Sequence, residues 1–397
     1  MVSDDSPQTT ELLPLAGCRV LERSRTVAAA YAGRMLAALG AQVVMLEPPD
    51  GSPLRQAPPL LENSGDSALF AYLAVGKRSL VCDVTSAAGR ALLARELDST
   101  DIFIDDTPLR ERAAQGLDAL KIGAHHPQLV HVSVLPFGAT GPKADWSAEE
   151  VNLLHAGGEG FLLPNGLSNE LFPDRAPLKI YGHFGGYQGG CMAALSALSA
   201  WWVQPTAGGQ FVDVSVQDAV LSVGAFALQR LGDGSLEHRT SRRFRYGGVF
   251  EAQGGFIELL TLEDRQWSAL VELLGSPAWA TDEALRDPLE RSRRGDEING
   301  HIRAWMACHA VEDIVRRAQQ LGVPAAKYRT PDEVIHGEQE RARGLFAPAV
   351  LEGGTPAQVL VAPFQFRCTP LAGGGRVPAL GEMSQEAAHE TAQEALP

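Results

Sequence analysis

The sequence predicts an α/β fold built around a mainly parallel sheet. Short runs of branched apolar residues alternate with Ala- and Leu-rich segments through the first 140 residues, a pattern typical of strands joined by crossover helices. An Ala-rich helical pattern at 28–39 ends before Gly40, where a glycine commonly closes a helix. The next run, 41–46 (AQVVML), has the composition of a buried strand. Together these observations place helices on both faces of the sheet.

The remaining elements of this region follow in chain order. A turn at 15–17 precedes the first strand, and Ser86 is placed to cap the helix after the third strand. The Gly-rich stretch 181–190 leads into an Ala- and Leu-dense helix. The expected strands are residues 18–22, 41–46, 78–84, 101–105, 129–135 and 211–216, and the expected helices are 28–39, 87–97 and 191–202.

The composition changes after about residue 229, which predicts a second, smaller domain. Its first pattern is a hairpin at 248–262, and a strand is expected at 323–328. The tail after Leu351 is rich in Gly and Pro and predicts loops and short strands. Polar helices are expected at 264–274, 298–309 and 311–321.

Length and composition exclude several classes of protein. The 397 residues predict roughly two domains, and 34 Lys and Arg against 48 Asp and Glu give a net charge of −14. This charge argues against general binding of nucleic acid or anionic membranes. The 5 cysteines lack a CxxC pair, which favours reduced thiols over a disulfide framework or zinc site. Without a signal-peptide pattern or an apolar run of about 20 residues, the expected location is cytoplasmic.

No single motif identifies a reaction. The GxGxxG fingerprint is absent from the turn after the first strand, which argues against the usual NAD binding. Ala28 and its small neighbours still bring a helix N-terminus to that turn, where free N–H groups can hold a polar ligand group or simply pack. His155 has acidic neighbours but no second histidine, so no metal site is expected.

Blocks in fixed order over nearly the whole chain are similar to one known family. Residues 14–55 (PLAGCRVLERSRTVAAAYAGRMLAALGAQVVMLEPPDGSPLR) resemble the opening of the family III CoA-transferases, which include formyl-CoA transferase and alpha-methylacyl-CoA racemase. The resemblance continues through residues 76–84, 89–106, 126–142, 208–220, 265–275, 322–334 and 378–382.

This resemblance implies a Rossmann-like large domain, formed by residues 1–228 and 326–397, and a smaller α+β domain at 229–325. It also implies an interlocked dimer, either a homodimer or a heteromer with a related subunit. The expected substrates are an acyl-CoA, which brings coenzyme A, and a carboxylic acid, with no metal, NAD, nucleic acid or membrane involved. The positions implied for CoA binding are Val27, Ala28, Asp83, Val84, Thr85, Asp106, Thr107, Arg112 and Lys143.

The catalytic aspartate of the transferases falls at Gly186 in this resemblance, and a glycine cannot attack a thioester. The racemase pattern instead places His183 where its aspartate stands and Glu149 where its proton-transferring histidine stands. Glu150 keeps an acid near a position where relatives often carry one. These four residues mark the candidate catalytic site.

The family's Asn-Phe after the fourth strand is Asp106-Thr107 in this chain. The resemblance therefore implies a negative charge along the path of a polyphosphate ligand. Asp106 in place of the family's asparagine is therefore expected to disfavour CoA binding.

Three functions remain open on the sequence. In the first, the chain is a CoA-transferase subunit without its own nucleophile. It is paired with an Asp-bearing paralogue, much as benzylsuccinate CoA-transferase joins two unequal subunits. Alternatively, it is a self-sufficient transferase, racemase or related acyl-CoA enzyme that uses another residue such as Glu150. The third reading is a CoA-binding scaffold without turnover.

Overall fold

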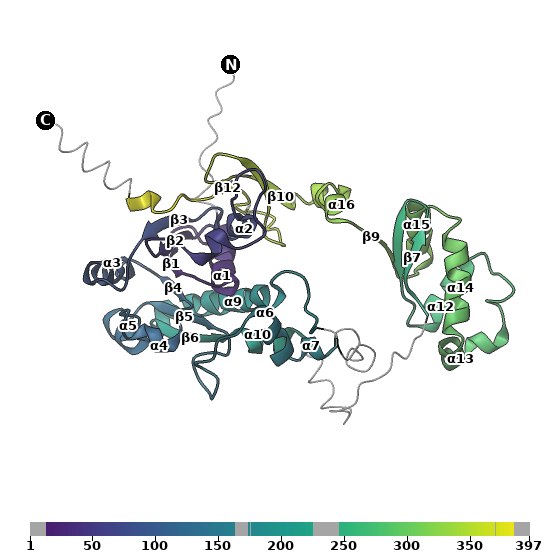
Figure 1. Ribbon diagram of the computed structural model, residues 1–397, viewed down its shortest axis with the longest axis horizontal. Helices are drawn as coiled ribbons and strands as arrows, with labels where there is room; N and C mark the ends of the chain where they lie inside the picture. The colour runs from purple at the N-terminus through teal and green to yellow at the C-terminus, as the bar shows by residue number, and fades with distance from the viewer. Residues whose placement is uncertain (1–12, 163–173, 175, 225–245, 370, 385–397) are drawn as a thin grey trace, which may run out of the picture. The chain divides into compact units, whose positions relative to one another are not determined.

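A computed structural model describes residues 13–162, 174, 176–224, 246–369 and 371–384 (Figure 1). Contacts divide the chain into two compact units. The larger takes in the described residues of 1–164, 172–237 and 341–397, and the smaller takes in those of 165–171 and 238–340. The domain boundaries expected at 228/229 and 325/326 stay predictions.

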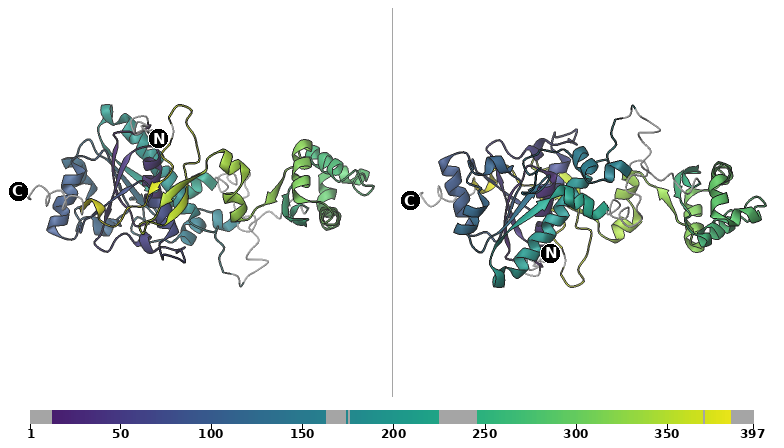
Figure 2. Two further views of the ribbon diagram at one scale, coloured as in Figure 1. Left: turned by 90° about the horizontal axis from the view of Figure 1, so that it is seen from above. Right: turned by 90° about the horizontal axis from the view of Figure 1, so that it is seen from below.

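A six-stranded parallel sheet forms the centre of the larger unit, with the strand order β3-β2-β1-β4-β5-β6 (Figures 1 and 2). The α/β fold class is thereby confirmed. The strand order reverses direction between β1 and β4, and open α/β sheets bind ligands beside the carboxyl ends of the strands at such a point. The strands are β1 (Arg19–Arg23), β2 (Gln42–Glu47), β3 (Arg78–Val81), β4 (Ile102–Asp105), β5 (Val130–Leu135) and β6 (Gln210–Ser215).

Helices cover both faces of this sheet, because neighbouring residues of a strand point to opposite sides. Val20 of β1 packs into a core shared with α1 (Val27–Ala38) and α9 (Phe184–Ala207). Leu21 belongs to the opposite core, which contains residues of α3 (Ala87–Leu97). The other helices of this unit include α2 (Ala68–Ala74), α4 (Leu109–Arg112), α5 (Ala119–His125), α6 (Glu150–Ala156), α7 (Glu159–Leu162), α10 (Val216–Gly224) and the short η2 (Pro53–Gln56).

The chain after the smaller unit adds a three-stranded sheet to the larger unit, and two of its strands fall in the tail after Leu351, where short strands were predicted. Its order is β11-β10-β12, and Val359 packs in one core with residues of α2. The strands are β10 (Phe346–Val350), β11 (Pro356–Leu360) and β12 (Gly375–Arg376), and α17 (Glu338–Ala342) precedes them.

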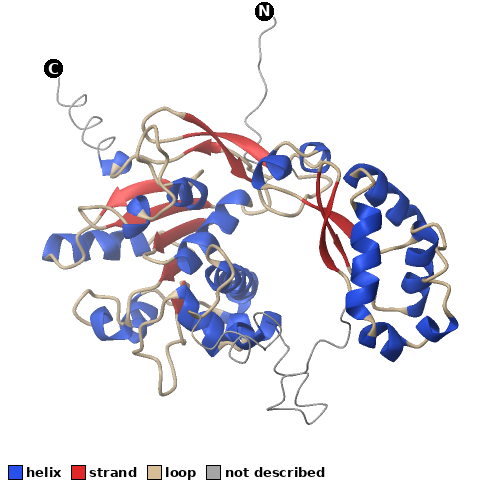
Figure 3. Ribbon diagram, turned by 45° about the vertical axis from the view of Figure 1, so that its right-hand side comes forward, coloured by secondary structure: helices blue, strands red, loops and turns tan. Residues whose placement is uncertain are grey.

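The smaller unit contains an antiparallel sheet of order β7-β8-β9 and a set of helices around one apolar core (Figure 3). Tyr246 and Trp267 are both buried in that core. The elements are β7 (Gly248–Ala252), β8 (Gly255–Leu259), α12 (Asp264–Leu273), η3 (Glu283–Arg286), α13 (Pro288–Arg293), α14 (Gly295–Met306), α15 (Val311–Leu321), β9 (Ala325–Tyr328) and α16 (Pro331–Ile335). None of the helices that the structure describes is both long enough and apolar enough to cross a membrane.

Helix α9 begins at Phe184 rather than at the expected residue 191, so the Gly-rich stretch is partly helical. Glycine weakens a helix in isolation, but here it lets two helices approach closely. A Cβ on Gly190 would lie 2.7 Å from the carbonyl oxygen of Ala28 in α1. A Cβ on Gly189 would lie 2.8 Å from the Val216 side chain. The start of the helix was missed because tertiary packing, and not local propensity, places it.

We expect the Gly190→Ala substitution to destabilise the protein by about 1–3 kcal/mol, because the new methyl group would push α1 and α9 apart. Gly123→Ala in α5 is the matched control, since a Cβ there meets nothing within 4 Å. That change should stabilise the protein by about 0.5–1 kcal/mol through helix propensity. Urea unfolding of both variants measures the two effects, and a stabilised Gly190→Ala protein would contradict the close packing.

Candidate active site at the carboxyl edge of the parallel sheet

The turns after β1 and β4 meet at the point where the strand order reverses. Asp106, just after β4, accepts hydrogen bonds through Oδ2 from the backbone N–H groups of Arg25 and Thr26, both 2.7 Å long. Thr26 is the residue that caps α1. Asp106 therefore ties the start of α1 to the end of β4.

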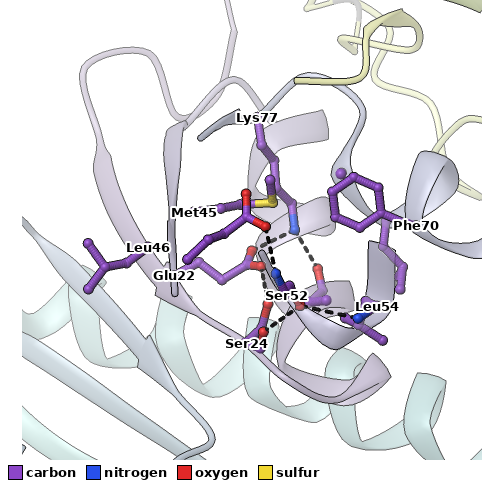
Figure 4. Close-up of a pocket in the computed structure, with 12 residues that line it drawn as sticks. Glu22, Ser24, Met45, Leu46, Ser52, Leu54, Phe70 and Lys77 are labelled. Atoms are coloured by element: carbon purple, nitrogen blue, oxygen red, sulfur yellow. Dashed lines mark hydrogen bonds and ion pairs between the residues drawn. The ribbon is translucent and has the colours of Figure 1, made fainter. Parts of the chain in front are cut away.

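A buried polar cluster fixes the same turn from the other side (Figure 4). The Lys77 Nζ atom lies 2.5 Å from Glu22 Oε2 and donates to the Ala30 carbonyl oxygen at 2.8 Å. The Ser24 hydroxyl donates to Glu22 at 2.6 Å, and the Ser52 hydroxyl donates to the Ser24 carbonyl at 3.0 Å. Burial raises the pKa of Glu22 and lowers the pKa of Lys77, while their mutual attraction opposes both changes. The turn is thus held between two buried acids, Glu22 and Asp106.

Thr107 and Arg112, two of the positions implied for CoA binding, are buried around Asp105. The Thr107 hydroxyl donates to Asp105 at 2.6 Å, and the Arg112 guanidinium lies 3.4 Å from the same carboxylate. Arg112 also donates to the Thr107 carbonyl oxygen at 2.8 Å and to the Ser133 hydroxyl at 2.7 Å. Burial raises the pKa of Asp105, but the nearby His131 ring and the Arg112 guanidinium outweigh this effect and hold that pKa below its usual range. Both residues stabilise the end of β4 in this structure.

The other positions implied for CoA lie at the same edge of the sheet but in separate turns. Asp83 accepts hydrogen bonds from the Thr85 N–H and hydroxyl and so shapes the turn between β3 and α3, where Val84 is buried. Lys143 is exposed in the loop after β5, with its Nζ atom 5.4 Å from the Phe137 ring centre and 5.5 Å from that of Trp146. Of these positions, Lys143 presents a cation to solvent.

The start of α9 brings together three of the predicted site residues. Glu150 accepts hydrogen bonds from the Gly185 N–H at 2.6 Å and from the Gly186 N–H at 3.2 Å. A Cβ on Gly186 would lie 3.2 Å from the Cβ of Val27, the first residue of α1. The position of the family aspartate, the alternative acid Glu150 and a predicted CoA contact are therefore neighbours.

His183 and Glu149 lie at helix starts. His183 is the residue before α9, and its side chain makes no capping hydrogen bond. Glu149 caps α6 and is exposed, with its N–H bonded to the Asn152 side chain at 2.8 Å. Their placement neither establishes nor removes a catalytic role, which stays a prediction.

An aromatic cluster lies next to Gly186, and its Tyr31 and Tyr72 members were not predicted from the sequence. The Tyr187 ring of α9 lies 4.9 Å from the Tyr31 ring of α1 and 6.2 Å from the Tyr72 ring of α2. Burial raises the pKa of Tyr187 to about 12, so its hydroxyl is protonated at neutral pH. One available signal was the placement of Tyr31 inside an otherwise Ala-rich helix.

No group of three or more His, Cys, Asp and Glu side chains within the described part of the chain is arranged to hold a metal ion. His155, the histidine considered as a ligand, instead has Nε2 within 3.0 Å of the Leu178 carbonyl oxygen.

The model of one protein family, CoA-transferase family III, matches residues 15–384. The chain belongs to CoA-transferase family III. This chain is 29% identical over 392 residues to a succinate–glutarate CoA-transferase of Agrobacterium fabrum, and the alignment covers 93% of each protein. It is 26% identical over 400 residues to the alpha subunit of a succinyl-CoA–L-malate CoA-transferase of Chloroflexus aurantiacus, and this alignment covers 97% of the chain and 90% of the relative.

A crystal structure of a CAIB/BAIF family protein from Brucella suis superimposes on the family III chain with a TM-score of 0.82. The two sequences are 27% identical, and the match covers 95% of this chain and 99% of the other. The Rossmann-like architecture expected for the larger unit is therefore found in a solved relative.

Asp106→Asn should stabilise the family III chain at neutral pH. Burial raises the pKa of Asp106 to about 6, although the Arg25 and Thr26 hydrogen bonds partly offset it. The folded state therefore binds the Asp106 proton more tightly than the unfolded state, so protonation of Asp106 stabilises the fold. That stabilisation is lost as pH rises from about 4 to about 6, where the carboxyl ionises. We expect a gain of about 1–2 kcal/mol at pH 7.5, below the ~3 kcal/mol of two pKa units, because the new amide nitrogen stays unpaired.

Urea unfolding at pH 7.5 and pH 4.5 measures this difference, which should shrink at the lower pH. Asp83→Asn is the control of opposite sign, because hydrogen bonds from Thr85 hold the pKa of Asp83 below its usual range. An Asp106→Asn protein no more stable than the wild type at pH 7.5 would contradict the argument.

Proposed function

We propose that this chain is one subunit of a family III CoA-transferase that moves CoA between an acyl-CoA thioester and a free carboxylic acid. In this proposal a related partner subunit supplies the nucleophilic aspartate. The observation that carries it is Gly186, which stands at the family's aspartate position at the start of α9, next to Val27.

The chemistry explains why the missing carboxylate matters. In the transferases an enzyme carboxylate attacks the thioester carbonyl, the C–S bond breaks and CoA leaves as the thiolate, with the acyl group held as a mixed anhydride. The thiolate then attacks the enzyme's carbonyl carbon of this anhydride, which releases the first acid and leaves CoA bound to the enzyme as a thioester. The acceptor carboxylate attacks that thioester, expels the CoA thiolate and forms a second mixed anhydride. The thiolate finally attacks the acceptor's acyl carbon, which gives the new acyl-CoA and regenerates the enzyme carboxylate. A helix start suits the carboxylate because its N–H groups stabilise negative charge. Gly186 keeps this backbone position without the reactive group.

The bonding of Glu150 supports the same proposal. Both of its carboxylate oxygens already accept N–H bonds at the start of α9, from Gly185 and Gly186. An oxygen that accepts a short hydrogen bond is a weaker nucleophile, and the two N–H groups are no longer available to an oxyanion. Glu150 acts as a cap on α9 in this proposal.

The partner subunit follows from the missing aspartate. The relative from Chloroflexus aurantiacus named as an alpha subunit aligns with nearly the whole chain, and an alpha subunit by its name has an unlike partner. We propose an interlocked pair made of this chain and an Asp-bearing paralogue.

The Gly186→Asp variant tests the missing-nucleophile proposal. We expect no transfer by the isolated wild-type chain and transfer at least about tenfold above that background for Gly186→Asp, since the variant restores the attacking carboxylate. Val27 must move by a few tenths of an ångström, because the new Cβ would lie 3.2 Å from the Cβ of Val27. New thioesters are measured by mass spectrometry with a panel of acyl-CoAs and acids.

Gly186→Asn is the matched control, of the same size but without a carboxylate. Addition of the Asp-bearing paralogue to the wild-type chain is the independent arm and should give full transfer. A folded Gly186→Asp protein as silent as Gly186→Asn, together with a silent pair, would overturn the proposal.

A second candidate function is a self-sufficient enzyme that uses Glu150. The observation in its favour is the position of the Glu150 carboxylate, which lies against the Gly186 N–H at 3.2 Å, beside the aspartate position. In this case the isolated chain forms thioesters without any partner.

Glu150→Gln in the isolated chain separates a cap from a nucleophile. As a cap, Glu150→Gln keeps an oxygen that accepts an N–H bond, so we expect a stability loss below about 1 kcal/mol and no transfer before or after the change. As a nucleophile, its loss would lower an existing transfer rate by about 100-fold or more. Glu251→Gln, at an exposed position of β7 in the smaller unit, is the control, and the readouts are thioester formation and urea unfolding.

A further inference from the structure

The N–H groups at the start of α1 are occupied by the chain's own carboxylate. A helix start beside the switch point of a parallel sheet commonly holds a ligand phosphate through such N–H groups. Here the Arg25 and Thr26 N–H groups both donate to Asp106 Oδ2 at 2.7 Å. A phosphate at this point would therefore meet a carboxylate in place of free donors.

The negative charge of Asp106 is buried. Asp106 is 5% exposed and follows the fully buried Asp105. Its second oxygen, Oδ1, is buried and has no hydrogen-bond partner among the described residues. A buried carboxylate with one oxygen unpaired leaves its charge poorly compensated, so the field at the start of α1 disfavours an anion.

The arginines of the same turn are already engaged with other side chains. The Arg25 guanidinium lies 3.2 Å from a Glu111 carboxylate oxygen. The Arg23 guanidinium donates to Gln115 at 2.8 Å and to the Thr107 hydroxyl. Both guanidinium groups therefore already have partners within the chain.

From these contacts we propose that Asp106 is a specificity-determining residue that keeps phosphate groups away from the start of α1. In the wild-type chain the phosphates of a CoA thioester are therefore held away from this point, at a cost to CoA affinity. The inference deepens the proposed function, since it assumes a CoA-type ligand at this site.

The test compares ligands with and without phosphate on the wild-type chain and on Asp106→Asn. In the variant the amide oxygen accepts the Arg25 and Thr26 N–H bonds, so the turn is kept while the charge is removed. Titration calorimetry at pH 7.5 uses CoA, inorganic pyrophosphate and pantetheine. We expect Asp106→Asn to bind CoA and pyrophosphate about tenfold more tightly, with pantetheine affinity unchanged.

Asp213→Asn is the matched control. Asp213, on the edge strand β6, likewise accepts a backbone N–H, from Ala139 at 2.6 Å, and lies away from the switch point. It should leave all three affinities unchanged. Asp106→Ser is the second variant, since a hydroxyl also accepts an N–H bond, and it should shift the affinities in the same direction.

Equal affinities for pyrophosphate and CoA in the wild type and both folded variants would overturn the inference. Tighter binding that extends equally to pantetheine would also overturn it, because phosphate would not be the group excluded. The proposed function is tested separately, by the CoA-transfer activity of the isolated chain and of the reconstituted pair. That activity reports on the nucleophile, whereas the ligand affinities of the Asp106 variants report on phosphate exclusion.

Discussion

The close approach of α9 to α1 is the constraint on which the site depends. Gly190 has no room for a Cβ against the Ala28 carbonyl oxygen, and Gly186 nearly touches Val27. Because Gly186 and Gly190 carry no side chains, α9 packs at short range against α1, and the starts of the two helices lie close together. A bulkier stretch in α9 would move its start away from α1, and Glu150 would no longer reach it while keeping its place in α6.

Acidic side chains complete both helix starts. Asp106 accepts the N–H groups before α1, and Glu150 accepts those at the start of α9. Each carboxylate stabilises the fold by satisfying donors that have no partner within the helix. The same bonds withdraw those donors from a ligand or an oxyanion. The chain therefore keeps the fold of CoA-transferase family III, while its own carboxylates occupy the N–H groups that would otherwise bind an anionic ligand or an oxyanion.

Much of the fold could be predicted because local patterns carry it. The branched apolar runs gave the parallel strands to within a few residues, and Ser86 caps α3 as expected. The start of α9 could not be predicted, since its glycines contradict helix propensity and are helical only through contact with α1. The burial of Thr107 and Arg112 around Asp105 could not be predicted either, because it depends on β4 and β5 lying side by side.

The sequence by itself determined the family, the α/β class and the absence of a carboxylate at position 186, because these follow from residue order and identity. Only the tertiary structure decided where the remaining acids act. Glu150 and Gly186 are far apart in the chain, yet the carboxylate bonds the Gly186 N–H. Asp106 reaches Arg25 and Thr26 only because β1 and β4 are neighbours. Hydrogen bonding is short-ranged, so the role of each acid depends on which backbone groups the fold brings within about 3 Å of it.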